Sequence, residues 1–286
     1  MLGVFFSILV VGVNSMVALA STAPGLGTAA SYAILAGTTV TNTGNSVIAG
    51  DIGISPGSAC TGFPAPCTGG GPGTLSGAIH AGDAQALQAK SDLTAAYGVA
   101  ASSPCNFNKT GVNLGGQTLT PGTYCQTTAP TLTGTLTLSG NGVFIFQIGS
   151  TLVTAPGATV AFINGAQPCN VFWQVSSSAT LDTTTTFVGT IMALTSISLN
   201  DGVTVAGRVL ARNGQVSLIN DRITVPTTCL PTTVVGPTAV AGAPSGGGGP
   251  LQNDGFPWIL ALVAGVLASA GAAGVGLTMR GHRRRA

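Results

Sequence analysis

The sequence contains few charged residues. Only 6% of its 286 residues are charged, whereas a soluble cytosolic domain carries about 25%. Glutamate is absent, and only two lysines and two histidines occur. The aspartates are isolated, so the sequence lacks the clustered carboxylates that a glycoside hydrolase or polysaccharide lyase requires. We therefore expect no enzyme activity, no cofactor, no metal site and no small-molecule substrate.

The few charges are distributed unevenly. Residues 21–255 contain seven aspartates and five lysines or arginines, which gives this part a formal charge of −2. The four remaining arginines all follow residue 279. Binding to nucleic acid requires a basic patch that neutralises phosphates, and residues 21–255 provide none. We therefore expect no nucleic-acid partner.

The first 20 residues are typical of a secretory signal peptide. An apolar run precedes Ala18-Leu19-Ala20, a small-x-small cleavage pattern that ends before Ser21. The basic segment that normally begins such a signal is missing. Either the true start lies upstream, which we favour, or the signal is unusual. Both interpretations predict an exported protein.

The last part of the chain predicts a membrane anchor. Residues 256–279 are uncharged, and at about 1.5 Å per residue a helix of this length crosses a hydrocarbon core of about 30 Å. The arginine-rich tail at 280–286 predicts a cytoplasmic C-terminus and an extracellular N-terminal domain. Residues 230–255 are rich in Pro, Gly and Thr, as flexible linkers are. Residues 21–229 are left as one folded domain at the cell surface. A sortase signal at 230–234 is a weaker interpretation.

Six cysteines in an exported chain favour disulfides over a metal site, because no CxxC motif or nearby histidine accompanies them. Six cysteines allow fifteen pairings. Proximity in the sequence favours Cys60 with Cys67, Cys105 with Cys125, and Cys169 with Cys229.

One segment of the domain is predicted to be helical. Within residues 83–101, Ala86, Ala89, Leu93 and Ala96 recur at spacings of three and four, and Asp83 can cap the helix start. Apolar residues elsewhere alternate with threonine, as at 131–138, which predicts half-buried strands. We therefore expect a mainly β domain with one long amphipathic helix.

A repeat in the second half predicts how the strands are arranged. Residues 187–191 recur eighteen residues later at 205–209, and a similar apolar segment stands sixteen residues earlier at 171–175. A repeat of this length is typical of a β-helix, or β-solenoid, in which successive coils stack and bury a continuous interior. An antiparallel β-sandwich is the rival, but it does not predict a fixed coil length.

Threonine is the candidate functional residue. Nine threonines are expected near one corner of the coil, where stacking at about 4.7–4.9 Å builds a flat array of hydroxyl and methyl groups. The alternative is that threonine simply favours exposed strands. Aspartates such as Asp182 and Asp221 are interpreted as turn residues. The nine candidates are Thr41, Thr43, Thr154, Thr159, Thr183, Thr184, Thr186, Thr204 and Thr224.

Several long segments closely resemble the ice-binding proteins of cold-adapted microbes. They include LGTAASYAILAGTTVTNTG at residues 26–44 and INGAQPCNVFWQV at residues 163–175. The resemblance extends over most of the domain and also includes residues 50–57, 114–124, 143–152 and 207–214. It implies a right-handed, roughly triangular β-helix with discontinuous chain order and one long helix along a side.

The resemblance also implies a function and a site. Family members adsorb to ice through one flat face, some with a Thr-Ala/Gly-x-Thr/Asn pattern. Incomplete matches to this pattern lie at 43–46, 154–157, 183–186 and 201–204, which adds Ser46 to the candidates. We expect a tethered, monomeric protein whose partners are ice and the membrane, with thermal hysteresis and inhibition of ice recrystallisation. The alternative is a non-catalytic adhesin or structural solenoid that binds glycan or protein.

Overall fold

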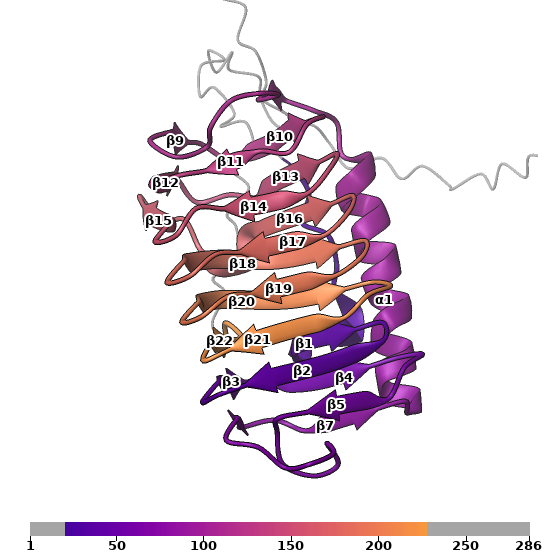
Figure 1. The fold of residues 1–286 in the computed structure, drawn as a ribbon. Helices are drawn as coiled ribbons and strands as arrows, with labels where there is room; N and C mark the ends of the chain where they lie inside the picture. The colour runs from indigo at the N-terminus through magenta and orange to yellow at the C-terminus, as the bar shows by residue number, and fades with distance from the viewer. Residues whose placement is uncertain (1–20, 228–286) are drawn as a thin grey trace, which may run out of the picture. The chain divides into compact units, whose positions relative to one another are not determined.

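The computed structural model describes residues 21–227. The predicted signal peptide, linker, membrane span and tail lie outside the described residues. Within residues 21–227, no helix is both long and apolar enough to cross a membrane. The described part is mainly β, as expected, with parallel strands stacked into a solenoid and one long helix, α1 (Ala84–Ser102), beside it (Figure 1).

The solenoid has three faces, and each coil visits them in the same order. Face 1 contacts α1 and contains β8 (Phe107–Asn108), β10 (Gly122–Gln126), β13 (Phe144–Ile148), β16 (Val171–Val175), β1 (Tyr32–Ala36), β4 (Asp51–Ile54) and β7 (Ile79–Ala81). Face 2 is a separate sheet of β11 (Thr131–Leu132), β14 (Leu152–Thr154), β17 (Ala179–Leu181), β19 (Ile197–Leu199), β21 (Val216–Ile219), β2 (Thr39–Thr43) and β5 (Ala59–Thr61). Face 3 contains β9 (Thr118–Leu119), β12 (Thr135–Ser139), β15 (Thr159–Ile163), β22 (Arg222–Thr224), β3 (Val47–Ala49) and β6 (Thr74–Leu75).

Two long strands, β18 (Thr186–Ala193) and β20 (Thr204–Ala211), continue from face 3 into face 1. Gly189 lies at the bend of β18 with a φ of 102°, a conformation that favours glycine. Gly207 pairs with it in β20, and a Cβ at Gly207 would lie 1.8 Å from the carbonyl oxygen of Gly189. The glycine shared by the two repeats therefore forms the corner of the coil.

The order of the coils is discontinuous in sequence, as the family resemblance implied. The first coil stacks on the last, because β1 pairs with β20, β2 with β21, and β3 with β22. Helix α1 begins after β7 at one end of the stack and ends before β8 at the other (Figure 1). Its 19 residues correspond to about 28 Å, enough to return the chain along most of face 1.

The eighteen-residue repeat is confirmed as a coil, because β18 and β20 pair in register from Thr186↔Thr204 to Ala193↔Ala211. The sixteen-residue offset to residues 171–175 is wrong, since Trp173 pairs with Ile191, again eighteen residues away. A shift of two residues keeps every side chain on the same side of a strand, so alternation alone does not detect it. Coil length also varies: Phe144 pairs with Val171, a separation of 27 residues.

An aromatic ladder fills the interior behind face 1. Tyr124, Phe146 and Trp173 come from paired strands of successive coils, and Phe187 follows Trp173 within the same coil. Phe107 covers the end of the ladder and is 42% exposed, and neighbouring ring centroids lie 3.9–5.4 Å apart. The Trp173 Nε1–H donates to the carbonyl oxygen of Val188 at 2.9 Å, so this buried polar atom is satisfied. Burial of large apolar surfaces of this kind is the main stabilising term for stacked coils.

Helix α1 packs closely on face 1 because four of its seven buried residues are alanines. Ala89, Ala96 and Ala100 are buried against face-1 side chains that include Phe172 and Leu210. Asp83 accepts from the Ala86 N–H at 2.8 Å and caps the helix as predicted, and the helix bounds agree closely with the predicted 83–101. The Gln147 amide donates to the Ala100 and Ser103 carbonyl oxygens and ties the other end of the helix to β13.

Two of the three predicted disulfides are confirmed, Cys60–Cys67 and Cys105–Cys125. The first closes a loop after β5, and the second joins the segment after α1 to β10. Cys229 lies outside the described residues, so its pairing with Cys169 stays a prediction.

Candidate functional site

The structure does not bring the ten predicted site residues together at one corner. Four of them lie on face 3: Thr159, Thr186, Thr204 and Thr224. Thr41 and Thr43 lie on face 2 in β2. Thr183 and Thr184 form the turn between β17 on face 2 and β18 on face 3. The remaining two, Ser46 and Thr154, are buried.

Ser46 and Thr154 satisfy polar groups inside the solenoid. The Thr154 hydroxyl oxygen accepts from the Asp182 N–H at 2.8 Å and is paired with the Thr185 hydroxyl at 2.9 Å. The Ser46 hydroxyl oxygen accepts from the Asp221 N–H at 2.9 Å. Both side chains are at most 1% exposed, so neither contributes to an external surface. The prediction that they belong to a surface array is wrong, because a short hydroxyl at an inward position can satisfy buried backbone groups.

Face 2 carries one column of outward side chains that crosses all seven strands. The strand pairings connect each member to the next without a gap. Six of the seven members carry a hydroxyl group, and the column contains no charge. With strands about 4.8 Å apart, six intervals extend over about 29 Å. The members in stacking order are Thr131, Val153, Thr180, Ser198, Ser217, Thr41 and Thr61.

Sequence reasoning missed every member of this column except Thr41. The missed signal is a triplet in which a hydroxyl residue stands between two buried apolar residues. It occurs in Ala179–Leu181 and Ile197–Leu199 and again around Ser217. Each triplet is too short to indicate a strand by itself, and the pairing register shows that the triplets stack.

At the corner between face 2 and face 3, side-chain amides hold two aspartates. Asn200 Nδ2 donates to Asp182 Oδ1 at 2.9 Å, and Asn220 Nδ2 donates to Asp201 Oδ1 at 2.7 Å. The hydrogen bonds from Asn200 and from the Thr183 N–H lower the pKa of Asp182. Asp182 therefore bonds within its own turn, which confirms its interpretation as a turn residue.

Face 3 also carries a column of threonines, but charge interrupts it. The pairings run Thr135, Thr159, Thr186, Thr204 and then Arg222, whose side chain is exposed. Two further members follow, Val47 and Thr74. Face 3 thus presents four adjacent threonines beside a long cationic side chain. Face 1 presents no comparable surface, because α1 packs on it.

The comparisons with known proteins agree with this architecture. The model of the Ice-binding-like family matches residues 34–224. This chain belongs to the Ice-binding-like family. An ice-binding protein of Nostoc sp. is 47% identical over 203 residues, which cover 69% of this chain and 72% of the relative. An ice-binding protein of Flammulina populicola is 36% identical over 240 residues and is covered to 97%.

Solved structures of this family share the fold. An ice-binding protein from an Antarctic biological consortium superposes with a TM-score of 0.67 at 42% identity, covering 76% of this chain and 96% of that structure. The ice-binding protein of the Antarctic ascomycete Antarctomyces psychrotrophicus superposes with a TM-score of 0.68 at 35% identity and is covered completely. The family resemblance inferred from the sequence motifs is confirmed.

Proposed function

We propose that this protein binds ice through face 2. The observation that carries the proposal is the uncharged hydroxyl column that crosses all seven strands of this face. Membership of the Ice-binding-like family supports ice as the ligand, and the unbroken column supports face 2 as the surface that binds it. The relatives described above are named as ice-binding proteins rather than enzymes, which supports a non-catalytic function.

The physical demands of ice favour such a surface. An ice plane presents neither a net charge nor a pocket, so a binder gains from rigidity, flatness and many weak contacts made together. Each hydroxyl contributes little, because its hydrogen bond to ice replaces one to liquid water. Methyl groups of threonine add apolar area that binding removes from liquid water. Binding strength should therefore depend on the continuity of the column more than on any one residue.

Face 3 fits this demand less well. The exposed Arg222 side chain continues the line of Thr186 and Thr204 and requires hydration of its charge. Docking face 3 on ice would remove water from that guanidinium without supplying a counter-charge. The predicted contacts of Thr159, Thr186, Thr204 and Thr224 with ice are therefore replaced in this proposal by the face-2 column.

Adsorption of this kind accounts for two activities that we propose for the protein. Bound molecules curve the ice front between them, which lowers the freezing temperature and slows recrystallisation. The uncharged sequence at 256–279 and the arginines that follow support display of the domain at the cell surface.

A growing ice crystal tests the proposal directly. Fluorescently labelled protein should accumulate on the ice surface, shape the crystal into facets and remain in the ice after washing. A labelled globular protein of similar size, without ice affinity, should be excluded from the same crystal. Exclusion of both proteins to the same extent would reject ice binding for this chain.

A further inference from the structure

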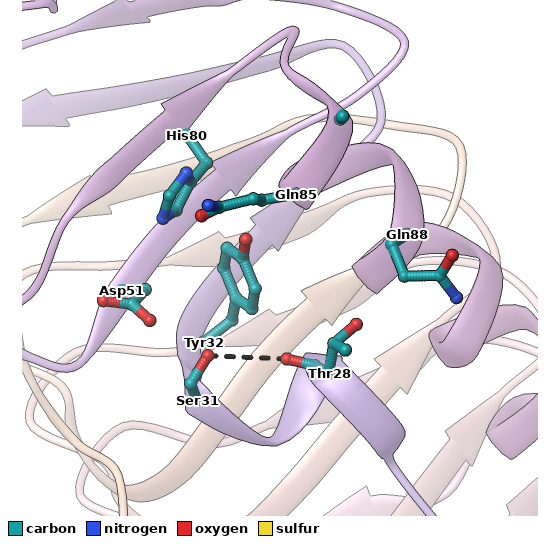
Figure 2. Close-up of a pocket in the computed structure, with 8 residues that line it drawn as sticks. Thr28, Ser31, Tyr32, Asp51, His80, Gln85 and Gln88 are labelled. Atoms are coloured by element: carbon teal, nitrogen blue, oxygen red, sulfur yellow. Dashed lines mark hydrogen bonds between the residues drawn. The ribbon is translucent and has the colours of Figure 1, made fainter.

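A cavity lies away from face 2, between the start of α1 and one end of face 1. Its volume is about 360 Å³, within the usual range for small-molecule sites. The 3₁₀ helix η1 (Gly27–Ser31), the strands β1, β4 and β7, and the first turns of α1 supply its walls. Figure 2 shows Tyr32 in the middle, with Asp51 and His80 on one side and Gln85 beyond its hydroxyl.

Tyr32 is the most informative residue of this cavity. Its side chain is 3% exposed, yet its hydroxyl has no hydrogen-bond partner among the described residues. The ring meets His80 edge-on, with centroids 5.7 Å apart. A Cβ at Gly53 would lie 2.6 Å from a ring carbon of Tyr32, so glycine at this position makes room for the ring. This hydroxyl is not one of the fully enclosed polar atoms of the described residues, so it opens onto the cavity, where water or a ligand can bond to it.

The polar groups around Tyr32 are held in place and keep atoms free for a ligand. The Ala78 N–H donates to Asp51 Oδ1 at 2.9 Å, and His80 Nδ1 pairs with Asp83 Oδ2 at 2.8 Å. These bonds use Oδ1 of Asp51 and Nδ1 of His80, so Oδ2 of Asp51 and Nε2 of His80 remain available to a ligand. Gln85 and Gln88 add amides that both donate and accept hydrogen bonds.

The charge of the cavity restricts the ligand. No lysine or arginine lines it, Asp51 does, and Asp83 stands beside it. An anion would therefore be repelled. The described residues also contain no group of three His, Cys, Asp or Glu side chains that could hold a metal ion. What remains is an aromatic ring surrounded by hydroxyl, amide and single carboxylate groups, which suit a neutral molecule with several hydroxyls.

We propose that this cavity binds a neutral sugar residue, with Tyr32, Asp51 and Gln85 as its main polar contacts. Burial and the nearby Asp83 and Asp51 carboxylates raise the pKa of Tyr32 to about 12, which keeps the hydroxyl protonated as a donor near neutral pH. The site would bind without chemical change, so the sugar is a ligand and not a substrate. It goes beyond ice binding because it lies on face 1, away from the hydroxyl column.

Ligand-observed NMR with the full-length protein tests this site. The neutral probes are the methyl glycosides of glucose, galactose and mannose together with N-acetylglucosamine, and the charged probe is the anion glucuronate. At least one neutral probe should bind with a dissociation constant of about 1 mM or below, and glucuronate should bind more weakly. Tyr32→Phe should raise the dissociation constant of the neutral probe by roughly three- to tenfold, which is the effect of losing one hydrogen bond.

Tyr97→Phe is the matched control, because Tyr97 is also a buried tyrosine under α1 but its hydroxyl already accepts from Gln174 and donates to Val175. Tyr97→Phe should lower the melting temperature and leave sugar binding unchanged. Tyr32→Phe should weaken sugar binding and leave the melting temperature unchanged. Ice shaping should survive in both variants. Absence of binding by all neutral probes, stronger binding of the charged probe, or equal binding by Tyr32→Phe and the wild type would each overturn the proposal.

Discussion

Faces 2 and 3 are built from the same residue type and differ in continuity. On face 2 the hydroxyl column passes through seven strands with only Val153 lacking a hydroxyl. On face 3 four threonines are followed by Arg222. A strand position favours threonine on either face, so threonine content alone does not distinguish a binding surface from an ordinary exposed sheet. The difference shows that register decides which hydroxyls form one surface.

The largest expected effect comes from a bulky residue in the middle of face 2. Ser198 stands at the fourth of seven column positions, so Ser198→Tyr should lift the face from ice and abolish ice shaping. The matched variant is Thr204→Tyr at the exposed centre of face 3, which should retain ice shaping. Microscopy of single crystals gives the readout, and unchanged melting temperatures exclude unfolding. Loss of activity in Thr204→Tyr with retention in Ser198→Tyr would assign binding to face 3.

The next effect concerns the corner that joins the two faces. Asp221 is buried, and its two carboxylate oxygens accept from the Val203 and Ile219 N–H groups at 2.8 Å. Asp221→Asn replaces one acceptor with a donor and leaves an N–H unsatisfied, so the free energy of unfolding should fall by about 1–3 kcal/mol. Chemical denaturation near pH 5, where the buried Asp221 carboxyl is still protonated, measures this change. A variant as stable as the wild type would show that these bonds do not hold the corner.

The same residue predicts a pH dependence. Burial raises the pKa of Asp221 to about 7, and the nearby Asp201 charge adds a smaller increase. The hydrogen bonds from the Ile219 and Val203 N–H groups lower this pKa but do not offset the effect of burial. Between pH 4 and 7 the folded state retains a proton that the unfolded state releases, so this group's contribution to stability falls as pH rises. Asp221→Asn should flatten that part of the stability profile, which denaturation at several pH values can detect. An identical slope in the variant would refute the assignment.

A smaller effect is expected at the turn between faces 2 and 3. Thr184 has a φ of 57°, a conformation that is strained for a β-branched residue. The neighbouring coils use glycine at the adjacent turn positions, Gly157 at 68° and Gly202 at 76°. Thr184→Gly should therefore stabilise the domain by up to about 1 kcal/mol, measured as an increase in unfolding free energy. Thr183→Gly, one residue earlier, is the control and should not stabilise.

The smallest expected effect tests the value of a complete column. Val153→Thr replaces the single apolar member of the face-2 column with a residue of the same shape. Because Val153 is exposed, stability should change by less than about 0.5 kcal/mol, and thermal hysteresis should rise slightly or stay equal. Arg222→Thr extends the threonine line of face 3 from four to five adjacent members, with Val47 still following, and should leave ice binding through face 2 unchanged. A large gain in Arg222→Thr alone would indicate that both faces bind ice.

Local sequence signals predicted the elements that depend on nearby residues. The spacing of Ala86, Ala89 and Leu93 predicted the helix, and Asp83 caps it. Short separations predicted the Cys60–Cys67 and Cys105–Cys125 disulfides. The candidate site was predicted less well, because a hydroxyl side chain carries no mark of its direction. Thr154 and Thr186 look alike in the sequence, yet Thr154 is buried within a hydrogen-bond network and Thr186 is exposed.

The sequence by itself determined the β-rich class, the single long helix, the two disulfides and the family. These follow from composition, from spacings within a few residues and from extended motifs. The tertiary structure decided which hydroxyls share a surface. Coils of different length stack on one another, and β2 from the first coil pairs with β21 from the last, placing Thr41 beside Ser217. Only the pairing of strands far apart in the sequence places Thr41 and Ser217 in one column. Side-chain alternation determines to which face of a strand a residue points, but it does not determine which strand lies beside it.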